Sequence, residues 1–179
     1  MTDSELSGII RMVPDFPVRG IQFFDVTTLF KDPAAFAELI DRMYELYKDK
    51  GITKVAGIES RGFIAGAALA VRLGAGFVPI RKPGKLPADT VSESYAKEYG
   101  SDTVEIHSDA IEPGDVVLIH DDILATGGTS VAAIKLVKKF TPKAVYANFI
   151  IDITDVPRSA FFPEDVEVTS LLRLAEKPE

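Results

Sequence analysis

The chain has 179 residues, 46% of them hydrophobic, and a formal net charge of −7. This length suits one domain with a substantial core, and the acidic balance argues against nonspecific affinity for nucleic acid or an anionic membrane. The absence of cysteine excludes disulfides and thiolate chemistry, and the start MTDSELSGII lacks the basic and long apolar segments of a signal peptide. We therefore expect a globular, cytoplasmic protein that binds neither nucleic acid nor membrane.

Residues 4–12 are predicted to form a short helix that ends before Pro14. The aromatic and turn-rich stretch that follows, residues 14–30, is interpreted as a loop over a pocket or the core. Asp32 then N-caps a predicted helix with Pro33 at its first position, because an aspartate accepts hydrogen bonds from the first helical N–H groups. The spacing of apolar residues predicts a buried stripe at Phe36, Leu39, Ile40, Met43, Leu46 and Tyr47, with Gly51 as the C-terminal stop.

Two strands, at residues 54–58 and 77–80, are predicted on either side of a small-residue helix at 63–73. Residues 81–107 then break the pattern, because they begin with a basic, proline-containing segment and are too polar for a core. A polar excursion of this length inside a domain is typical of a functional lid. We expect this lid to be a loose antiparallel ribbon, since parts of it alternate between apolar and polar side chains, at 90–95 and 103–106.

Residues 115–140, DVVLIHDDILATGGTSVAAIKLVKKF, join an apolar strand to a helix through a glycine turn. The turn leaves unpaired N–H groups at the start of the helix, where the helix dipole adds positive charge. We therefore expect an anion site suited to phosphate, while the adjacent Asp121 and Asp122 suit hydroxyl groups or a hydrated divalent cation. The strand is predicted at 116–119 and the helix from Thr129, with one apolar face made by Val131, Ile134, Val137 and Phe140.

The rest of the chain is predicted to add strands at 144–151 and 166–174 and a turn or short helix at 155–162. Strands that alternate with helices indicate an α/β fold with a mostly parallel sheet covered on both faces. Ligands bind such sheets beyond the carboxyl ends of the strands. Three loops are therefore expected on one rim, namely those after Ile58, Ile80 and Ile119.

These three loops carry complementary groups. The third holds the two acids and the phosphate turn, and the first two supply cations and polar groups, namely Glu59, Ser60, Arg61 and Gly62, then Arg81, Lys82 and Lys85. Each charge alone is also compatible with a surface salt bridge or a solvated side chain. Together they predict a ligand with two separated phosphate groups beside a diol or metal, which is the layout of phosphoribosyl pyrophosphate.

The motifs GIESRGF, RKPGKLP, SESY, KEYG, EIHSDAI and DDILATGGT occur in this order along nearly the whole chain. The sequence thereby resembles the type I phosphoribosyltransferases, and within them the adenine phosphoribosyltransferase family, to whose branch RKPGKLP and KEYG belong. The resemblance implies one domain, residues 1–179, with a five-stranded parallel sheet, a base-covering segment 1–31 and a flexible lid 81–107. It also implies a homodimer that makes AMP and pyrophosphate from adenine and phosphoribosyl pyrophosphate with Mg²⁺.

The resemblance also implies roles for single residues. The 5′-phosphate would be held by Ala125, Thr126, Gly127, Gly128 and Thr129. Asp121 and Asp122 would hold the ribose hydroxyls and help to position Mg²⁺. The pyrophosphate loop would be Glu59, Ser60, Arg61 and Gly62, with further charge from Arg81 and Lys85. The implied catalytic residues are Arg61, Lys85, Glu98 and Tyr99, of which the last two close the lid and the glutamate assists protonation changes of the purine. Backbone groups of residues 21–24, including Gln22 and Phe24, would read the purine.

Three positions depart from the family pattern. Phe24 stands where many members have arginine, and Gln22 and His120 stand where an aliphatic residue is usual. The first two bear on the choice of base, so transfer to hypoxanthine, guanine or xanthine is an alternative, as is a non-catalytic ligand-sensing module. His120 is either a neutral side chain packed at the strand end or a group whose charge weakens ribose or Mg²⁺ binding below about pH 6.5.

Overall fold

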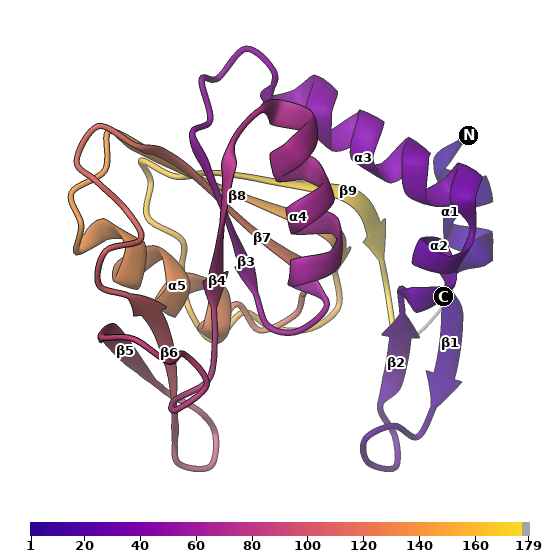
Figure 1. The fold of residues 1–179 in the computed structure, drawn as a ribbon. Helices are drawn as coiled ribbons and strands as arrows, with labels where there is room; N and C mark the ends of the chain where they lie inside the picture. The colour runs from indigo at the N-terminus through magenta and orange to yellow at the C-terminus, as the bar shows by residue number, and fades with distance from the viewer. Residues whose placement is uncertain (177–179) are drawn as a thin grey trace.

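The computed structural model describes residues 1–176, and its centre is a five-stranded parallel sheet. The strands are Lys54–Ile58 (β3), Gly76–Ile80 (β4), Val116–Leu124 (β7), Ala144–Ile153 (β8) and Glu167–Leu174 (β9). They pair in the order β4-β3-β7-β8-β9, each neighbour parallel to the next (Figure 1). The predicted parallel α/β sheet is confirmed.

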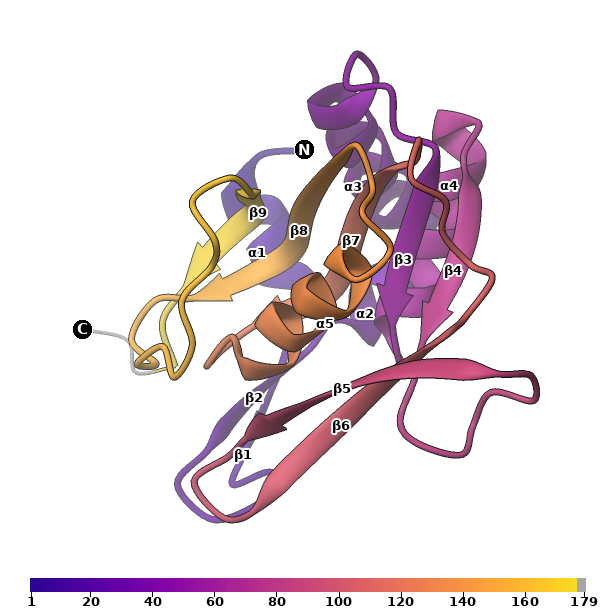
Figure 2. The ribbon, with the colours of Figure 1, turned by 90° about the vertical axis from the view of Figure 1, so that its left-hand side faces the viewer.

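Helices cover the two faces of the sheet, and each face has its own apolar core. α5 (Gly128–Lys138) lies on one face, and α3 (Pro33–Tyr47) and α4 (Gly62–Leu73) lie on the other (Figure 2). Successive residues of a strand point to opposite faces. On β7, Leu118 therefore packs into the core on the α3 and α4 side, whereas Ile119 packs into the core on the α5 side.

The start of α3 agrees with the sequence, but its end and its apolar stripe differ. Asp32 accepts the predicted N-cap hydrogen bonds at 3.0 and 2.9 Å. The fully buried positions recur every four residues up to Tyr47, which leaves Leu46 at the flank of the stripe and 41% exposed. The helix ends at Tyr47 rather than next to Gly51, which lies in the following turn with φ +67°.

The N-terminal segment contains more regular structure than predicted. Its elements are Asp3–Ile9 (α1), Arg11–Pro14 (β1), Gln22–Asp25 (β2) and Thr27–Lys31 (α2). The predicted helix at 4–12 ends at Ile9, because the next residues pair antiparallel with β2. The loop interpretation was therefore wrong for residues 22–30, where a short strand and helix are stabilised by tertiary contacts, including the burial of Phe24.

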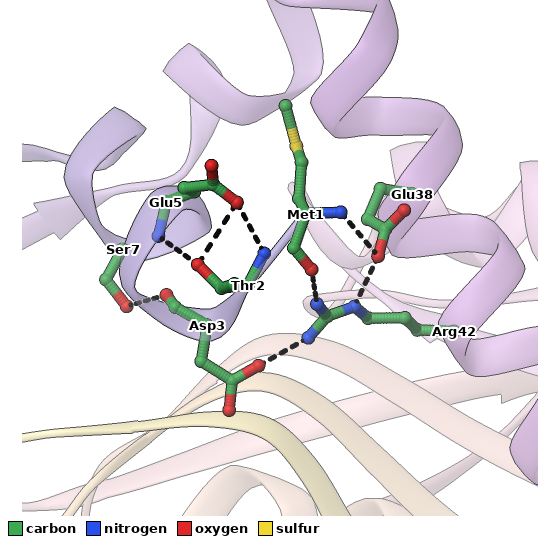
Figure 3. A network of polar contacts seen from close by, with 7 residues as sticks. All are labelled: Met1, Thr2, Asp3, Glu5, Ser7, Glu38 and Arg42. Carbon is green, nitrogen blue, oxygen red and sulfur yellow. Dashed lines mark hydrogen bonds and ion pairs between the residues drawn. The ribbon is translucent and has the colours of Figure 1, made fainter.

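Arg42 of α3 anchors the first residues of the chain (Figure 3). Its guanidinium donates to Asp3 at 2.6 Å, to Glu38 at 2.8 Å and to the backbone carbonyl of Met1. These contacts hold α1 against α3. The β1–β2 ribbon follows α1 in the chain.

The predicted antiparallel ribbon is confirmed by the pairing of Thr90–Ala96 (β5) with Ser101–His107 (β6), while its role as a lid stays a prediction. Val104 and Ile106 of β6 are buried in the core under α5, which fixes the base of the ribbon. In Figures 1 and 2 the β5–β6 ribbon and the β1–β2 ribbon project from the same end of the sheet.

One further expectation is corrected. β7 does not end at Ile119 but continues to Leu124, because its pairing with β8 persists to the end of the strand. Of the two alternatives for residues 155–162, a turn or a short helix, the structure shows turns and bends. Within residues 1–176, none of the helices is both long and apolar enough to cross a membrane.

Candidate active site

The two acids of β7 lie on a strand rather than in a loop, so they point to opposite faces of the sheet. Alternation along β7 places Asp122 on the face of His120 and Asp121 on the face of Ile119, and Asp121 Oδ1 also lies 3.1 Å from where a Cβ on Gly62 would be. The start of α4 lies very close to this strand: a Cβ on Gly62 would be 2.8 Å from the carbonyl oxygen of His120. Glycine at this position therefore lets the loop after β3 reach the acids.

Arg61 and Asp122 form an ion pair on the α4 side of the sheet, in which the Arg61 Nε–H donates to the carboxylate. The Arg61 guanidinium also stacks over the ring of Phe23, 5.2 Å from its centroid. Arg61 thus joins β7 to the N-terminal ribbon, and its own charge is already matched by a buried acid.

Asp121 faces a small cavity of about 130 Å³ on the α5 side. The burial of its carboxyl group and the charge of the adjacent Asp122 raise the pKa of Asp121 well above its ordinary value. A cation or a hydroxyl donor next to Asp121 would therefore be favoured. The other walls of the cavity come from β3, β4 and their loops, the lid and the phosphate turn: Ile58, Glu59, Ile80, Arg81, Lys82, Val104 and Thr129.

The predicted phosphate turn lies at the N-terminus of α5. Gly127 adopts φ +86°, a conformation that suits glycine, and no side chain caps the helix. The first N–H groups of the helix therefore have no side-chain cap and suit an anion. The turn is held from behind by residues 158–159: Arg158 donates to the carbonyl of Ala125, and the Ser159 N–H donates to the carbonyl of Thr126 at 2.9 Å.

Glu59 is bound on the cavity wall by the next loop. Its carboxylate accepts the Lys82 N–H at 2.7 Å and an Arg81 N–H at 3.2 Å. Burial acts to raise the pKa of Glu59, but these two donors outweigh it and hold the pKa below its ordinary value. Ser60, joined to Glu59 by a cis peptide bond, is exposed, and so is Lys85.

The lid lies over the phosphate turn. The Tyr95 hydroxyl is 2.7 Å from the Thr129 hydroxyl, and a Cβ on Gly128 would lie 3.3 Å from the Tyr95 ring. Glu98 and Tyr99 occupy the tip of the ribbon, where Tyr99 is 87% exposed. A second cavity, about 480 Å³, lies beneath the tip and is lined by Tyr95, Ala96, Lys97, Glu98, Thr126, Gly128, Thr129 and Ser159.

Gln22 and Phe24, the two residues of the N-terminal ribbon that depart from the family pattern, have different surroundings. The Phe24 side chain is only 3% exposed and packs in the core, so it does not face the site. Phe23, on the opposite side of β2, is the residue that meets Arg61. Gln22 is half-buried at the start of the strand. Residues 22–24 thus present backbone and the Phe23 ring, rather than the Phe24 ring, toward Arg61.

His120 is fully buried next to the acids and bonded to Asn148 at 3.1 Å. Burial lowers the pKa of His120 to about 4, although Asn148 and the Asp122 charge oppose the shift. The imidazole is therefore neutral at physiological pH, as in the first of the two interpretations.

Several contact-making residues could not be identified from sequence. Phe23 belongs to a strand too short for reliable alternation, and Arg158 follows the site by about thirty positions with no motif around it. Tyr95 had a weak signal, as the aromatic residue on the apolar side of an alternating ribbon.

The structure thus brings two acids of β7, the glycine turn before α5 and the Arg81–Lys82 pair to one end of the sheet. The family described as phosphoribosyl transferase domain matches residues 25–171, and the chain belongs to this family.

Within this family, the chain is similar to adenine phosphoribosyltransferases of several organisms. The chain is 63% identical over 174 residues to adenine phosphoribosyltransferase of Bacteroides thetaiotaomicron, covering 97% of this chain and 99% of the relative. It is 54% identical to that of Shewanella loihica, over 82% of this chain and 81% of the relative. The crystal structure of adenine phosphoribosyltransferase from Rhodothermus marinus has a TM-score of 0.91 and 50% identity, over 96% of this chain and 98% of that one. The Saccharomyces cerevisiae enzyme, with adenine and an imino-altritol bisphosphate, has a TM-score of 0.79 and 40% identity, over 87% and 95%.

Proposed function

We propose that the protein transfers the 5-phosphoribosyl group from phosphoribosyl pyrophosphate to adenine, giving AMP and pyrophosphate in purine salvage. The observation that carries this proposal is the cavity in which Asp121, Thr129 and the Arg81–Lys82 pair meet. Its arrangement suits a ribose between a 5′-phosphate on the turn and a diphosphate on the cations. The yeast relative, solved with adenine and a bisphosphate, supports the same pair of ligands.

In the proposed reaction the bond from C1 of the ribose to the diphosphate breaks while N9 of adenine bonds to C1. Positive charge builds on the ribose and negative charge on the departing pyrophosphate. Arg81, Lys82 and Lys85 stabilise the leaving group, and the acid Asp121 favours the positive ribose. The proton on N9 is lost during the transfer, and Glu98 is placed on the lid to assist that change. Lid closure excludes water, which would otherwise compete as the nucleophile.

The residues of the site fit Mg²⁺ that arrives with the substrate. No group of three or more acids or histidines within residues 1–176 is arranged as a metal site. Mg²⁺ is usually held by one or two carboxylates together with substrate phosphates. Asp121, whose pKa is raised by burial and by Asp122, would gain from a nearby cation. When bound, Mg²⁺ would neutralise charge on the diphosphate.

Adenine is preferred over an oxopurine because the main departure from the family pattern lies away from the site. The Phe24 side chain is buried in the core, so the substitution leaves the backbone of residues 22–24 available to read the base. A homodimer and a cytoplasmic location are proposed from the family resemblance alone.

The test is pyrophosphate release from phosphoribosyl pyrophosphate and Mg²⁺, with adenine, hypoxanthine, guanine and xanthine offered separately. Turnover with adenine alone is the expected result. Turnover with an oxopurine would show that Gln22 or its neighbours changed the base preference. Binding of the sugar phosphate without turnover of any base would favour a sensing module.

The role of Glu98 is tested with Glu98→Gln. Turnover is expected to fall by roughly 10²- to 10⁴-fold, the usual span for a positioned acid or base. Glu112→Gln, which neutralises an exposed acid outside the lid, is the matched control and should retain activity. Near-normal turnover of Glu98→Gln would remove this residue from the mechanism.

A further inference from the structure

The lid carries an acid, Asp102 of β6, that the proposed reaction does not use. One of its carboxylate oxygens, Oδ2, accepts from the Lys82 ammonium, from the Tyr95 hydroxyl at 3.3 Å and from the Lys97 ammonium at 3.5 Å. The other oxygen accepts the Thr103 N–H at 2.9 Å. Two ammonium groups and a phenol thus surround one carboxylate, which is the environment that a phosphate oxygen would also prefer.

Lys82 belongs at the same time to the rim of the site. It lines the 130 Å³ cavity together with Asp121 and Thr129, and its N–H holds Glu59. In this structure its ammonium is bound by the lid carboxylate. The Lys82 ammonium is therefore paired with Asp102, and an incoming diphosphate would have to displace this carboxylate to bind the lysine.

The same contacts connect the two phosphate subsites. Asp102 accepts from Tyr95, and the Tyr95 hydroxyl lies 2.7 Å from Thr129 on the phosphate turn. One chain of polar contacts therefore runs from Lys82 through Asp102 and Tyr95 to Thr129. Lys82 and Thr129, the two ends of this chain of contacts, both line the 130 Å³ cavity, so a sugar diphosphate bound there would meet both.

We propose that Asp102 is a positioning residue that holds Lys82 under the lid before substrate binds and competes with the diphosphate of the substrate for this lysine. The inference rests on the proposed function, because the diphosphate is the incoming anion. When the diphosphate enters, Lys82 exchanges the carboxylate for a phosphate oxygen, and the lid loses one of its attachments. Lys97 and Tyr95 remain as partners of Asp102, so its carboxylate is not left without donors.

Asp102 stays ionised over the range in which such an enzyme is assayed. The hydrogen bond from Lys82 lowers the pKa of Asp102 to about 2, against a smaller opposing effect of burial. Asp102 competes only moderately with the diphosphate for Lys82, because the two side chains are 41% and 24% exposed and solvent weakens their ion pair. Ion pairs with this exposure shift an equilibrium constant by only about 2- to 5-fold.

The experiment measures the Kd of phosphoribosyl pyrophosphate with Mg²⁺ by calorimetry, and its KM and kcat at saturating adenine. Asp102→Asn keeps the shape but removes the charge, and we expect Kd and KM to fall about 2- to 5-fold. Asp102→Glu, which restores the charge, should return both toward the wild-type values. Asp165→Asn makes the same change of net charge at the ion pair with Lys138, at the C-terminal end of α5, and should change neither.

A double-mutant cycle separates competition for Lys82 from a general effect on the lid. In a Lys82→Ala background, Asp102→Asn should no longer tighten binding, because the contested cation is absent. An unchanged or raised Kd for Asp102→Asn, or the same tightening without Lys82, would overturn the proposal. If the wild-type protein releases no pyrophosphate with any base, the proposed function fails. If the wild-type protein turns over but Asp102→Asn leaves Kd and KM unchanged, only the inference about Asp102 is rejected.

Discussion

Two antiparallel ribbons flank the carboxyl ends of the central sheet, and they are attached in different ways. The lid ribbon, β5–β6, is buried at its base through Val104 and Ile106, and near the site it is joined to the body by partly exposed polar contacts, such as Tyr95 with Thr129 at 2.7 Å. The N-terminal ribbon, β1–β2, is anchored by the buried ring of Phe24. A charged substrate can replace polar contacts but not the burial of an aromatic ring. We therefore expect the lid to move and the N-terminal ribbon to serve as a fixed wall.

The largest effect should come from removing the apolar anchor of the fixed wall. Phe24→Ala is expected to lower the free energy of unfolding by about 3–5 kcal/mol, because it deletes a buried ring and leaves a cavity. Chemical denaturation measures the change. Phe161→Ala removes a ring that is 87% exposed and should cost under about 0.5 kcal/mol. Equal costs for the two variants would mean that burial does not fix the N-terminal ribbon.

His120 of β7, the central strand between the two ribbons, allows the burial of the sheet to be tested through the pH dependence of unfolding. The pKa of His120 is lowered from 6.5 to about 4, so the unfolded chain binds a proton that the folded chain does not. His120 therefore stabilises the fold fully above pH 6.5, and this contribution is lost as the pH falls toward 4. The loss is about 3 kcal/mol, since each pKa unit corresponds to about 1.4 kcal/mol.

Unfolding measured between pH 7 and pH 4 should show this loss, and His120→Gln should show a shallower slope. Because the imidazole stays neutral above about pH 5, the affinity for the sugar phosphate should not change through His120 between pH 5.5 and 8. A decrease in affinity near pH 6.5 that disappears in His120→Gln would contradict the buried, neutral state.

Salt should affect the two ribbons differently. Raising the salt concentration from about 0.1 to 1 M shortens the Debye length from about 10 to 3 Å and weakens exposed ion pairs. Amide hydrogen exchange in β5–β6 is expected to accelerate a few-fold, whereas exchange in β1–β2 should change less. An equal increase of amide hydrogen exchange in both ribbons would contradict the distinction between a mobile lid and a fixed wall.

The smallest effect is expected from the polar contacts that precede the N-terminal ribbon. Arg42→Ala removes the ion pairs with Asp3 and Glu38, and Asp3 is 74% exposed. Such pairs contribute about 1 kcal/mol or less, so the melting temperature should fall by only a few degrees. Lys48→Ala, at the exposed pair with Glu45, is the control. A loss comparable with that of Phe24→Ala would show that charge, not burial, fixes the N-terminal segment.

The two ribbons also differ in how far they could be predicted. The lid strands could be predicted because apolar and polar side chains alternate at 90–95 and 103–106, within a segment too polar for the core. The N-terminal strands have four residues each, and β1 ends in Pro14, a residue typical of turns. For the same reason Phe23, which stacks over Arg61, could not be distinguished by sequence from Phe24, which lies in the core.

The sequence by itself determined the strands and helices of the central sheet, the cap of α3 and the glycine turn before α5, because these depend on local periodicity and on residues adjacent in the chain. Only the tertiary structure decided that β7 runs on through Asp121 and Asp122 and so divides them between the two faces of the sheet. It alone paired Arg61 with Asp122, placed residues 158–159 behind the phosphate turn and set Asp102 against Lys82. Such contacts depend on sheet pairing and on the packing of segments far apart in the chain, and local sequence patterns do not encode either.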